Sequence, residues 1–348
     1  MKVVASAPGK IVVSGEYAVL VGAPALVLAV DRRVVCTLRD SAAGGWNFAT
    51  HGFAPDVRHT LESLTAGPDL ARSDPAFLCQ HVVRQLGLVG IGVDQLPAHV
   101  HVDIDSRAGF DSGKKLGLGT SAAVCCALTG ALLTRIGADH DVLPIALAAH
   151  RRAQGGRGSG LDVAASCEGG LIRFEAGQPP TVTRVAFPPV SRAAIWTGAS
   201  ADTSQHVSHF DAWRAGTIPA ELRKLMTEAS RVADAVSDKG VRAPSAAEGA
   251  LTPLSFMRQL RAYTAALRAL DDVAHLGIYS AAHRLLGELA ENHGVVYKPC
   301  GAGGGDIGMA FAIDARALDP FERAALAAGF ERLPLELDEH GITVGIEG

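Results

Sequence analysis

The sequence has no excess of positive charge. Its 348 residues include 32 Lys and Arg against 36 Asp and Glu, which gives a formal net charge of −4 at pH 7. A protein that binds nucleic acid neutralises phosphates with a basic face, so this balance argues against nucleic acid as the main partner. A small anionic ligand is still compatible with it, because a few local cations are enough to bind one.

The sequence also lacks a long hydrophobic run and any pair of cysteines at CxxC spacing. The apolar stretch at residues 17–30 is too short to span a bilayer and is interrupted by Gly22 and Pro24. None of the six cysteines belongs to a CxxC pair, which favours reduced, buried thiols in the cytoplasm. The first ten residues, MKVVASAPGK, do not have the layout of a signal peptide. We therefore expect a cytoplasmic protein with no membrane partner.

No internal repeat is visible, and both halves of the sequence predict strands and helices, which indicates an α+β fold. The length suits one large or two medium domains, and the turn at Pro188-Pro189 predicts domains at residues 1–187 and 188–348. Strands are expected within residues 3–38, at 98–105, 169–174, 193–198, 295–298 and 307–313, and in a final strand pair. Helices are expected at residues 121–136, 142–153, 221–236, 256–270, 278–289 and 320–328.

Neither a P-loop nor a dinucleotide-binding glycine pattern is present, but residues 114–124 read KKLGLGTSAAV. Glycines let backbone N–H groups approach a ligand, and the helix that follows adds unpaired N–H groups and its dipole. This combination predicts a phosphate site. The alternative is a helix capped by Thr120 or Ser121 after a tight turn, with no ligand. The residues expected to bind phosphate are Lys114, Gly117, Leu118, Gly119, Thr120, Ser121 and Ala122.

Three segments together resemble the signature motifs of the GHMP kinases, the superfamily of galactokinase, homoserine kinase, mevalonate kinase and phosphomevalonate kinase. They are Pro8-Gly9-Lys10, the GLGTSAA of residues 117–123 and the GAGGG of residues 301–305. The resemblance implies a two-domain fold, with an N-terminal domain like ribosomal protein S5 domain 2 and a ferredoxin-like C-terminal domain. Residues 1–187 would then be the ATP-binding domain, with ATP at the junction and its phosphates over the central glycine segment.

Within the superfamily, the chain most resembles the phosphomevalonate kinases. The features that carry this resemblance are Lys114-Lys115, the AHRRAQG and GSGLDVAAS of residues 149–166, the TGASADTS of residues 197–204, and Asp306. Ser14 and Tyr17 stand where mevalonate kinases usually have His. The resemblance implies transfer of the γ-phosphoryl group of ATP to (R)-5-phosphomevalonate, in the mevalonate pathway of isoprenoid biosynthesis. The alternatives are a mevalonate kinase or another member with a hydroxyl acceptor, and a binding protein of this fold without turnover.

A phosphorylated acid needs several cations or N–H donors when it binds beside ATP. The cations in or beside the motif segments are Lys114, Lys115, Arg151, Arg152, Arg157 and Lys298. For Arg151 and Arg152 the alternative is an interaction with the C-terminal end of the helix at residues 142–153.

Lys10 is expected beside the transferring phosphoryl group. It follows a tight Pro-Gly turn and opens an apolar strand, where an ammonium group needs an anionic partner. Lys115, with the amides of the glycine segment, would hold phosphate oxygens. By the resemblance, Ser121 helps to hold Mg²⁺, and Thr120 replaces the usual first Ser of the motif.

Asp162 matches the Asp that acts as the base in mevalonate kinases. Because a phosphate acceptor is already ionised near pH 7, little base catalysis is needed here. Asp162 could instead orient Lys10, take part in Mg²⁺ binding, or cap a helix through residues 163–165. Mevalonate kinases also have a Mg²⁺-ligating Glu upstream of this Asp, but residues 150–154 contain no carboxylate.

The remaining expected site residues belong to the acceptor side: Ser14, Glu16, Tyr17, Ser159, Gly160, Ala302, Gly303, Gly304 and Asp306. The alternative role of Tyr17 is packing. The alternative role of Asp306 is to close a turn. His99 and His101 share a strand face, but no third metal ligand is evident, so they are expected to face solvent. We expect ATP, Mg²⁺ and a small-molecule substrate as ligands, and a monomer or homodimer.

Overall fold

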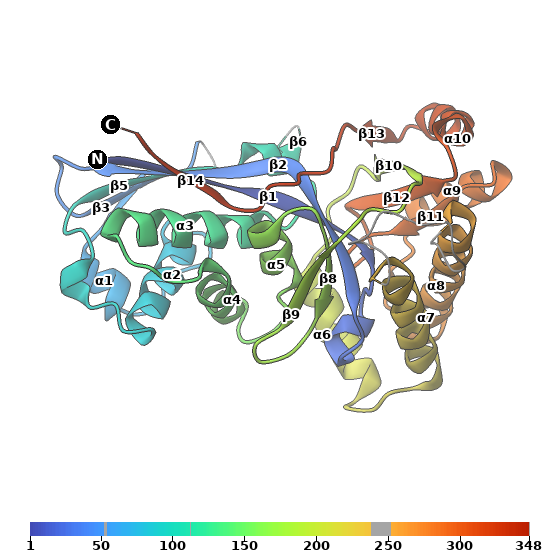
Figure 1. Ribbon diagram of the computed structural model, residues 1–348, viewed down its shortest axis with the longest axis horizontal. Helices are drawn as coiled ribbons and strands as arrows, with labels where there is room; N and C mark the ends of the chain where they lie inside the picture. Colours follow the sequence, from blue (N-terminus) through green and yellow to red (C-terminus); the bar gives the residue numbers. More distant parts are fainter. Residues whose placement is uncertain (52–53, 112, 238–251, 348) are drawn as a thin grey trace, which may run out of the picture.

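The computed structural model describes residues 1–51, 54–111, 113–237 and 252–347, and it confirms the α+β class. The molecule is elongated, with a large sheet towards one end and a small sheet flanked by helices at the other (Figure 1). No helix in the described part of the chain is long and apolar enough to cross a membrane.

The large sheet has the strand order β14-β1-β2-β5-β3-β4, and β8 and β9 extend it from β2. Its strands are β1 (Lys2–Ser14), β2 (Ala25–Asp40), β3 (Trp46–Ala49), β4 (Val57–His59), β5 (Val100–Asp105), β8 (Leu171–Glu175), β9 (Thr181–Val185) and β14 (Thr343–Glu347). The small sheet has the order β11-β12-β10-β13 and is antiparallel, with β10 (Ser191–Trp196), β11 (Val296–Pro299), β12 (Ile307–Ala312) and β13 (Glu331–Leu333). A hairpin of β6 (Phe110–Asp111) and β7 (Lys114–Lys115) precedes the central glycine segment.

Strands β1 and β2 pair along almost their whole length, and this ribbon reaches from the large sheet towards the small one (Figure 1). The tight turn predicted at Pro8-Gly9 is wrong, because both residues lie inside β1 at a shift in its register with β2. Proline has no N–H to donate to a ladder, so it is accommodated at such an irregularity. A Cβ on Gly9 would lie 3.0 Å from the carbonyl oxygen of Leu118, so the missing side chain lets the glycine segment approach the strand.

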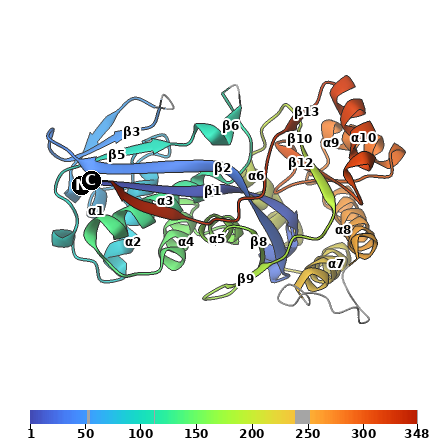
Figure 2. The same ribbon diagram turned by 45° about the horizontal axis from the view of Figure 1, so that its top comes forward.

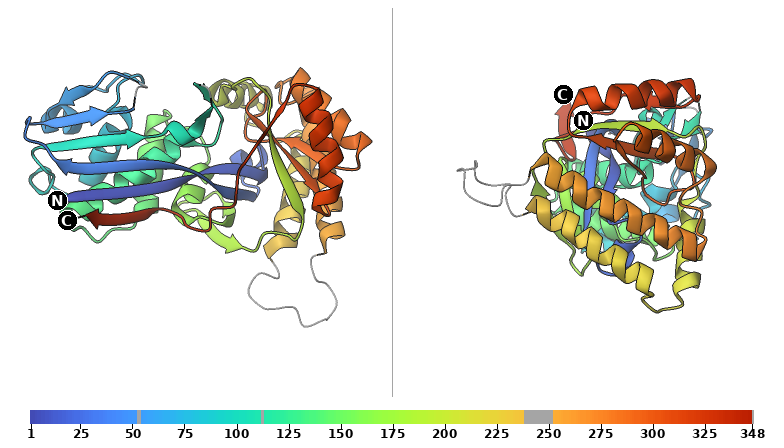
Figure 3. Two further views of the ribbon diagram at one scale, coloured as in Figure 1. Left: turned by 90° about the horizontal axis from the view of Figure 1, so that it is seen from above. Right: turned by 90° about the vertical axis from the view of Figure 1, so that its right-hand side faces the viewer.

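Four helices lie against one face of the large sheet (Figures 1 and 3): α2 (Phe77–Leu88), α3 (Thr120–Ile136), α4 (Val142–Ala153) and α5 (Leu161–Glu168). Helices α3 and α4 have the predicted positions. Helix α3 is buried on nearly all sides, because it packs against β1 and β2 and against the three other helices. This explains why its sequence is apolar without a polar stripe.

The second half contains α6 (Thr203–Arg214), α7 (Ala220–Ser237), α8 (Pro253–Ala274), α9 (Ala281–Asn292) and α10 (Ala315–Ala327). Helices α7 and α8 lie side by side (Figure 3). The start predicted for the last helix is wrong, because Asp314 caps α10 by accepting a hydrogen bond from the amide of Ala317, and Pro320 lies inside the helix. Ile278 precedes α9 rather than starting it.

The final two strands do not pair with each other as predicted. Strand β13 joins β10 in the small sheet, whereas β14 crosses back and pairs with β1 (Figure 2). Several elements were not predicted from the sequence, namely β3, β4, β9, α2, α6 and the short helix α1 (Leu61–Thr65).

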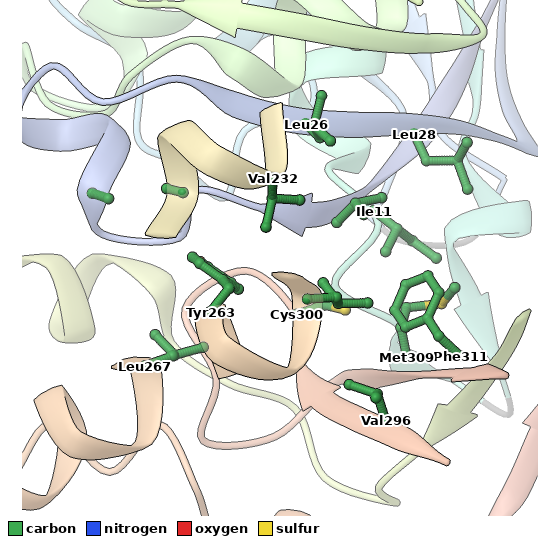
Figure 4. Close-up of a cluster of buried hydrophobic side chains, with 14 of the residues drawn as sticks. Ile11, Leu26, Leu28, Val232, Tyr263, Leu267, Val296, Cys300, Met309 and Phe311 are labelled. Carbon is green, nitrogen blue, oxygen red and sulfur yellow. The ribbon is translucent and has the colours of Figure 1, made fainter. Parts of the chain in front are cut away.

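The two halves share one hydrophobic core. Ile11, Leu26 and Leu28 of the β1–β2 ribbon pack with residues of α7, α8 and the small sheet, including Tyr263 and Phe311 (Figure 4). The division into residues 1–187 and 188–348 remains a prediction. The shared core and β14 tie the second half firmly to the first.

Candidate functional site

A cavity of ≈ 640 Å³ lies where three glycine-bearing segments meet. The first is residues 8–10, the central glycine segment is residues 117–123, and the third is residues 301–305. It is bounded by the end of β1, the start of α3, the loop between α4 and α5, the start of α6 and the loop after β11. The expected site residues that line it are Lys10, Glu16, Tyr17, Lys115, Gly117, Gly119, Ser121, Ser159, Gly160, Asp162, Ala302 and Asp306. The fold therefore brings together residues that are nearly 300 positions apart in the sequence.

The central glycine segment leaves the start of α3 without a side-chain cap. Gly117 and Gly119 both have a φ of +75°, and Gly119 is the N-cap residue. The alternative of a helix capped by Thr120 or Ser121 is therefore wrong. The hydroxyl of Thr120 is buried against Gly109 and has no hydrogen-bond partner within the described residues, and the hydroxyl of Ser121 faces His150. Uncapped N–H groups at a helix start favour an anion.

Lys10 lies directly against this segment. Its backbone N–H donates to the carbonyl of Leu118 at 2.8 Å, and its Nζ donates to the carbonyl of Gly117 at 3.2 Å. A Cβ on Gly119 would lie 3.1 Å from the Lys10 side chain, so the bare glycine makes room for it. An ammonium group has three N–H donors, so others remain for an anion in the cavity.

Asp162 lies in the first turn of α5, and Gly160, with a φ of +89°, is the N-cap residue. The alternative role of Asp162 as the helix cap is therefore wrong, although its Oδ1 accepts a hydrogen bond from the amide of Val163 at 2.9 Å. A carboxylate is stabilised at this end of a helix by the helix dipole. Among the ion pairs of the described residues there is none between Asp162 and Lys10, so the proposed orienting contact is not formed here. Both side chains flank Gly119.

His150 is a site residue for which the sequence predicted no role. It lies in the last turn of α4 and is 2% exposed. Its Nε2 is 3.0 Å from the hydroxyl of Ser121, and its Nδ1 is 3.8 Å from the carboxylate of Asp162. The amide nitrogen of Gln154, one turn further along, is 3.4 Å from Nε2. The i, i+4 spacing of His150 and Gln154 was the only signal in the sequence that they share a helix face.

Glu16, which lines the cavity, belongs to a buried ion pair that the sequence did not predict. Lys298 donates to Glu16 and to the carbonyl of Val12, and its side chain is fully buried. The hydroxyl of Tyr263 donates to the other oxygen of Glu16 at 2.5 Å. Lys298 was one of the cations expected near an anionic ligand. This is wrong, because its ammonium group is buried and donates to Glu16 and to Val12.

Tyr17 combines packing with a polar contact. Its ring centroid is 5.1 Å from that of Phe210, and its hydroxyl donates to the carbonyl of Ala302 at 2.6 Å. Burial, with smaller effects from Asp271 and Glu16, raises the pKa of the Tyr17 hydroxyl far above its usual range, so it stays protonated. Tyr17 thereby joins the end of β1 to the third glycine segment.

Asp306 follows that third segment with a φ of +56°. Its carboxylate accepts a hydrogen bond from the amide of Ala201 at 3.2 Å, and a Cβ on Gly117 would clash with it at 2.4 Å. Burial raises the pKa of Asp306, and the Ala201 hydrogen bond and the charges of Lys10 and Lys115 oppose this rise. Asp306 thus closes its turn and also contacts the central glycine segment.

Several expected site residues do not line the cavity. Lys114 donates to the carbonyl of Gly198 at 3.4 Å and lies over the ring of Trp196. Arg157 donates to Ser208, and Arg151 lies 3.5 Å from the carbonyl of Ser159. The other expected residues outside its lining are Ser14, Leu118, Thr120, Ala122, Gly303, Gly304 and Arg152.

One wall of the cavity was not predicted from the sequence. Phe77 and Leu78 at the start of α2 face the cavity, together with Ala153 of α4. Arg72 also lines it and donates to the carbonyl of Ala153 at 3.1 Å. This wall presents the apolar side chains of Phe77, Leu78 and Ala153 and the planar guanidinium group of Arg72 to a ligand.

The donor set for a metal is small. No group of three or more His, Cys, Asp and Glu side chains gathers to hold a metal anywhere in the described ranges. Nδ1 of His99 accepts a hydrogen bond from the amide of Gly45, so this nitrogen has a structural role. At the cavity, Ser121 and Asp162 offer one hydroxyl and one carboxylate. This set fits Mg²⁺ that arrives with phosphates and keeps several waters, because Mg²⁺ commonly uses only one or two protein oxygens.

Comparisons with known proteins found relatives among the GHMP kinases. The model of the GHMP kinases N terminal domain matches residues 78–170, which include the central glycine segment and Asp162. The phosphomevalonate kinase of Streptomyces sp. strain CL190 is 29% identical over 364 aligned residues, covering 90% of this chain and 91% of the relative. The mevalonate kinase of Methanothermobacter thermautotrophicus is 34% identical over 180 residues, covering 51% of each chain.

A solved structure has the same fold. The phosphomevalonate kinase of Streptococcus pneumoniae, in complex with phosphomevalonate and AMPPNP, superposes with a TM-score of 0.76. The alignment covers 96% of this chain and 99% of that one, at 20% identity. At this identity the likeness concerns the fold alone.

Proposed function

Because this chain belongs to the GHMP kinase superfamily and is a phosphotransferase, we propose that it transfers the γ-phosphoryl group of ATP to (R)-5-phosphomevalonate. The product would be 5-diphosphomevalonate, in the mevalonate pathway. One observation carries the phosphoryl-transfer part of this proposal: the Lys10 ammonium lies on the uncapped, glycine-lined start of α3, inside the cavity. The choice of acceptor rests on a phosphomevalonate kinase that is 29% identical over 90% of the chain.

The nucleotide would occupy the side of the cavity that includes α2 and α3. Its phosphates would accept hydrogen bonds from the amides of residues 117–121, where the helix dipole favours negative charge. Its base would lie against Phe77, Leu78 and Ala153, which form the apolar wall beyond Ser121. The cavity volume of ≈ 640 Å³ is within the usual range for small-molecule sites, which is about 300–1,000 Å³.

The acceptor would occupy the side bounded by the end of β1 and the start of α6. Tyr17 and Asp306 line this side, with the hydroxyls of Thr203 and Ser204 opposite. Lys10 and Lys115 line the cavity, their charges oppose the rise in the pKa of Asp306, and they would lie between the two ligands. Two cations between two anionic groups reduce the repulsion that otherwise keeps those groups apart.

In the transfer step, an acceptor phosphate oxygen forms a bond to the γ-phosphorus as the bond to the β,γ-bridging oxygen breaks. The acceptor dianion and ATP together carry the same charge as the two products, so no proton has to leave. Catalysis is then a matter of positioning and charge stabilisation. Lys10 would stabilise the transferring group, and Lys115 would hold the phosphates.

Ser121 and Asp162 would hold Mg²⁺, and Mg²⁺ would neutralise charge on the nucleotide phosphates. In this arrangement Asp162 does not have to act as a base. Asp162 lines the cavity, its Oδ1 accepts from the amide of Val163, and its Oδ2 lies 3.8 Å from Nδ1 of His150.

Mevalonate kinase is the second candidate, and two observations favour it. A mevalonate kinase matches half of this chain at 34% identity. Among the described residues, Lys10, Arg72 and Lys115 are the only lysines and arginines that line the cavity, which is a small number for two phosphorylated ligands. With a hydroxyl acceptor a proton would have to leave, and Asp162 would take it. A small-molecule substrate, a cytoplasmic location and a monomeric or homodimeric state remain part of the proposal.

The test is an assay of ADP release from MgATP with mevalonate and 5-phosphomevalonate in separate reactions. We expect turnover with 5-phosphomevalonate and none with mevalonate. Turnover with mevalonate alone would favour the second candidate. Absence of ADP release with both acceptors, and with a panel of sugars and alcohols, would refute the assignment of activity.

A further inference from the structure

His150 is buried between Ser121 and Asp162, the two side chains that the proposed function assigns to the cation. Its ring spans the gap from Ser121 on α3 to Asp162 on α5, with Nε2 3.0 Å from the first and Nδ1 3.8 Å from the second. Helix α4 contributes Gln154 to the same place, with its amide nitrogen 3.4 Å from Nε2. A polar side chain that is 2% exposed is costly unless its polar atoms have partners.

The contacts of the ring decide which way the Ser121 hydroxyl points. An amide NH₂ group can only donate, so the Gln154 nitrogen 3.4 Å from Nε2 favours the tautomer in which that ring nitrogen is an acceptor. In this tautomer the Ser121 hydroxyl donates its proton to Nε2. Nδ1 carries the ring proton, on the side of the Asp162 carboxylate. With its proton directed at His150, the Ser121 oxygen turns its lone pairs towards the cavity that it lines.

We propose that His150 is a positioning residue that orients the Ser121 hydroxyl as an oxygen ligand for the divalent cation that binds with the nucleotide. This inference rests on the proposed function, because it concerns the same nucleotide site. A hydroxyl that rotates freely has to be ordered when the cation binds. One that donates to a buried acceptor already presents its lone pairs, so less order has to be imposed on binding.

The sequence around His150 explains why such a device is useful here. Residues 150–154 contain no carboxylate, and the site offers one carboxylate and one hydroxyl. Each protein oxygen therefore contributes a large share of the cation affinity. Groups that orient metal ligands from behind typically contribute about 10- to 100-fold to metal affinity.

Two matched variants separate the two nitrogens of the ring. In His150→Gln, the side-chain amide reaches the position of Nε2, so it can still accept from Ser121. In His150→Asn, the shorter amide reaches only the position of Nδ1. For each variant, calorimetry measures the affinity for ATP with excess Mg²⁺ and with EDTA. The ratio of the two affinities reports the cation contribution without any turnover.

We expect His150→Asn to lower this ratio about tenfold, to leave the affinity for ATP in EDTA unchanged, and to raise the Mg²⁺ concentration needed for half-maximal turnover. We expect His150→Gln to restore most of the ratio. A wild-type ratio in His150→Asn would overturn the inference, as would an equal loss of affinity in EDTA and in Mg²⁺.

A thermal melt shows whether each variant is folded, and the Ser121→Ala background supplies a second test. If His150 acts through Ser121, then His150→Asn adds no further loss to the ratio in Ser121→Ala, whereas independent effects would multiply. If His150→Asn fails to fold, the ratio in His150→Gln decides: a value near wild type supports the inference, and a tenfold loss overturns it. A wild-type protein that binds MgATP more tightly than ATP but never turns over would refute the proposed function alone.

Discussion

Lys298 and Glu16 form an ion pair whose side chains are 0% and 1% exposed. The two residues are 282 positions apart, one in β11 and the other just after β1, and Tyr263 of α8 completes the hydrogen bonding of the Glu16 carboxylate. The pair therefore fixes the small sheet and α8 onto the end of the β1–β2 ribbon, next to Tyr17 and the cavity.

Removing one partner of this pair leaves a buried charge without compensation. We expect Glu16→Gln to lower the free energy of unfolding by about 3–5 kcal/mol. The measurement is urea-induced unfolding. The control is Lys2→Met, which breaks the pair of Lys2 with Glu347, whose side chains are 47% and 58% exposed, and which should change the free energy by less than about 1 kcal/mol. Equal effects of the two variants would show that the buried pair is not a structural tie.

Gly119 has to be glycine for two separable reasons. Its φ of +75° strains any residue with a Cβ, and a Cβ would lie 3.1 Å from the Lys10 side chain. We expect Gly119→Ala to cost about 1–2 kcal/mol of stability through the backbone and to lower kcat at least about tenfold by displacing Lys10. Gly137, at the other end of α3, has a φ of +66°, and a Cβ on it would meet nothing within 4 Å.

Gly137→Ala is therefore the matched control for the backbone effect alone. It should lose similar stability in a thermal melt and keep the wild-type kcat. If both glycine variants keep wild-type turnover, the position assigned to Lys10 in the reaction is contradicted.

Asp162 serves the reaction as a cation ligand in this account, not as a base. We expect Asp162→Asn to lower turnover about 10- to 100-fold at low Mg²⁺, because the amide is a weaker ligand. Raising the Mg²⁺ concentration should recover most of the loss. The measurement is the Mg²⁺ dependence of kcat for wild type and variant. A loss that no Mg²⁺ concentration recovers would indicate proton abstraction, and with it a hydroxyl acceptor.

His283, which contacts the third glycine segment, is expected to make the free energy of unfolding depend on pH. It is buried, with Nδ1 2.8 Å from the Tyr297 hydroxyl and Nε2 3.0 Å from the carbonyl of Gly305. Burial lowers the pKa of His283 from 6.5 to about 4, while the Gly305 hydrogen bond opposes this shift. Below pH 6.5 the unfolded chain binds a proton that the folded chain does not, so stability falls as the pH falls from 6.5 towards 4.

From this group alone, we expect a loss of about 2 kcal/mol between pH 7.5 and pH 5. The measurement is the pH dependence of the free energy of unfolding in wild type and His283→Gln, which has no titrating group and should show a shallower slope. His293→Asn, at the exposed end of the same helix, is the matched control for the loss of a histidine side chain. Identical slopes in wild type and His283→Gln would contradict a neutral, buried His283.

The local sequence predicted much of the fold and of the site. The apolar residues of α3 and α4 mark helices because their composition and length allow little else, and the glycines at 117 and 119 indicate a bare backbone whatever the fold around them. The meeting of the three glycine-bearing segments was expected from a resemblance, and the structure brings them to one cavity.

The errors have a common cause, which is that distant contacts decide the role of a residue. From the sequence alone, Lys298 was interpreted as a ligand-binding cation, but in the fold its partner is Glu16. Pro8-Gly9 was interpreted as a turn, but in the fold this segment pairs with β2. His150 is one polar residue in an amphipathic helix until α3 and α5 place Ser121 and Asp162 on either side of it. No local pattern in the sequence reports these neighbours.

The central claim is that the acceptor atom is a phosphate oxygen, and ³¹P NMR of a competition reaction tests it most directly. The protein is mixed with MgATP and equal concentrations of mevalonate and 5-phosphomevalonate. The account predicts that the phosphomonoester signal of 5-phosphomevalonate disappears and that two coupled signals of a new P–O–P linkage replace it. Growth of the 5-phosphomevalonate signal at the expense of mevalonate, with no new P–O–P signals besides those of ADP, would contradict the account and assign the phosphoryl group to a hydroxyl acceptor.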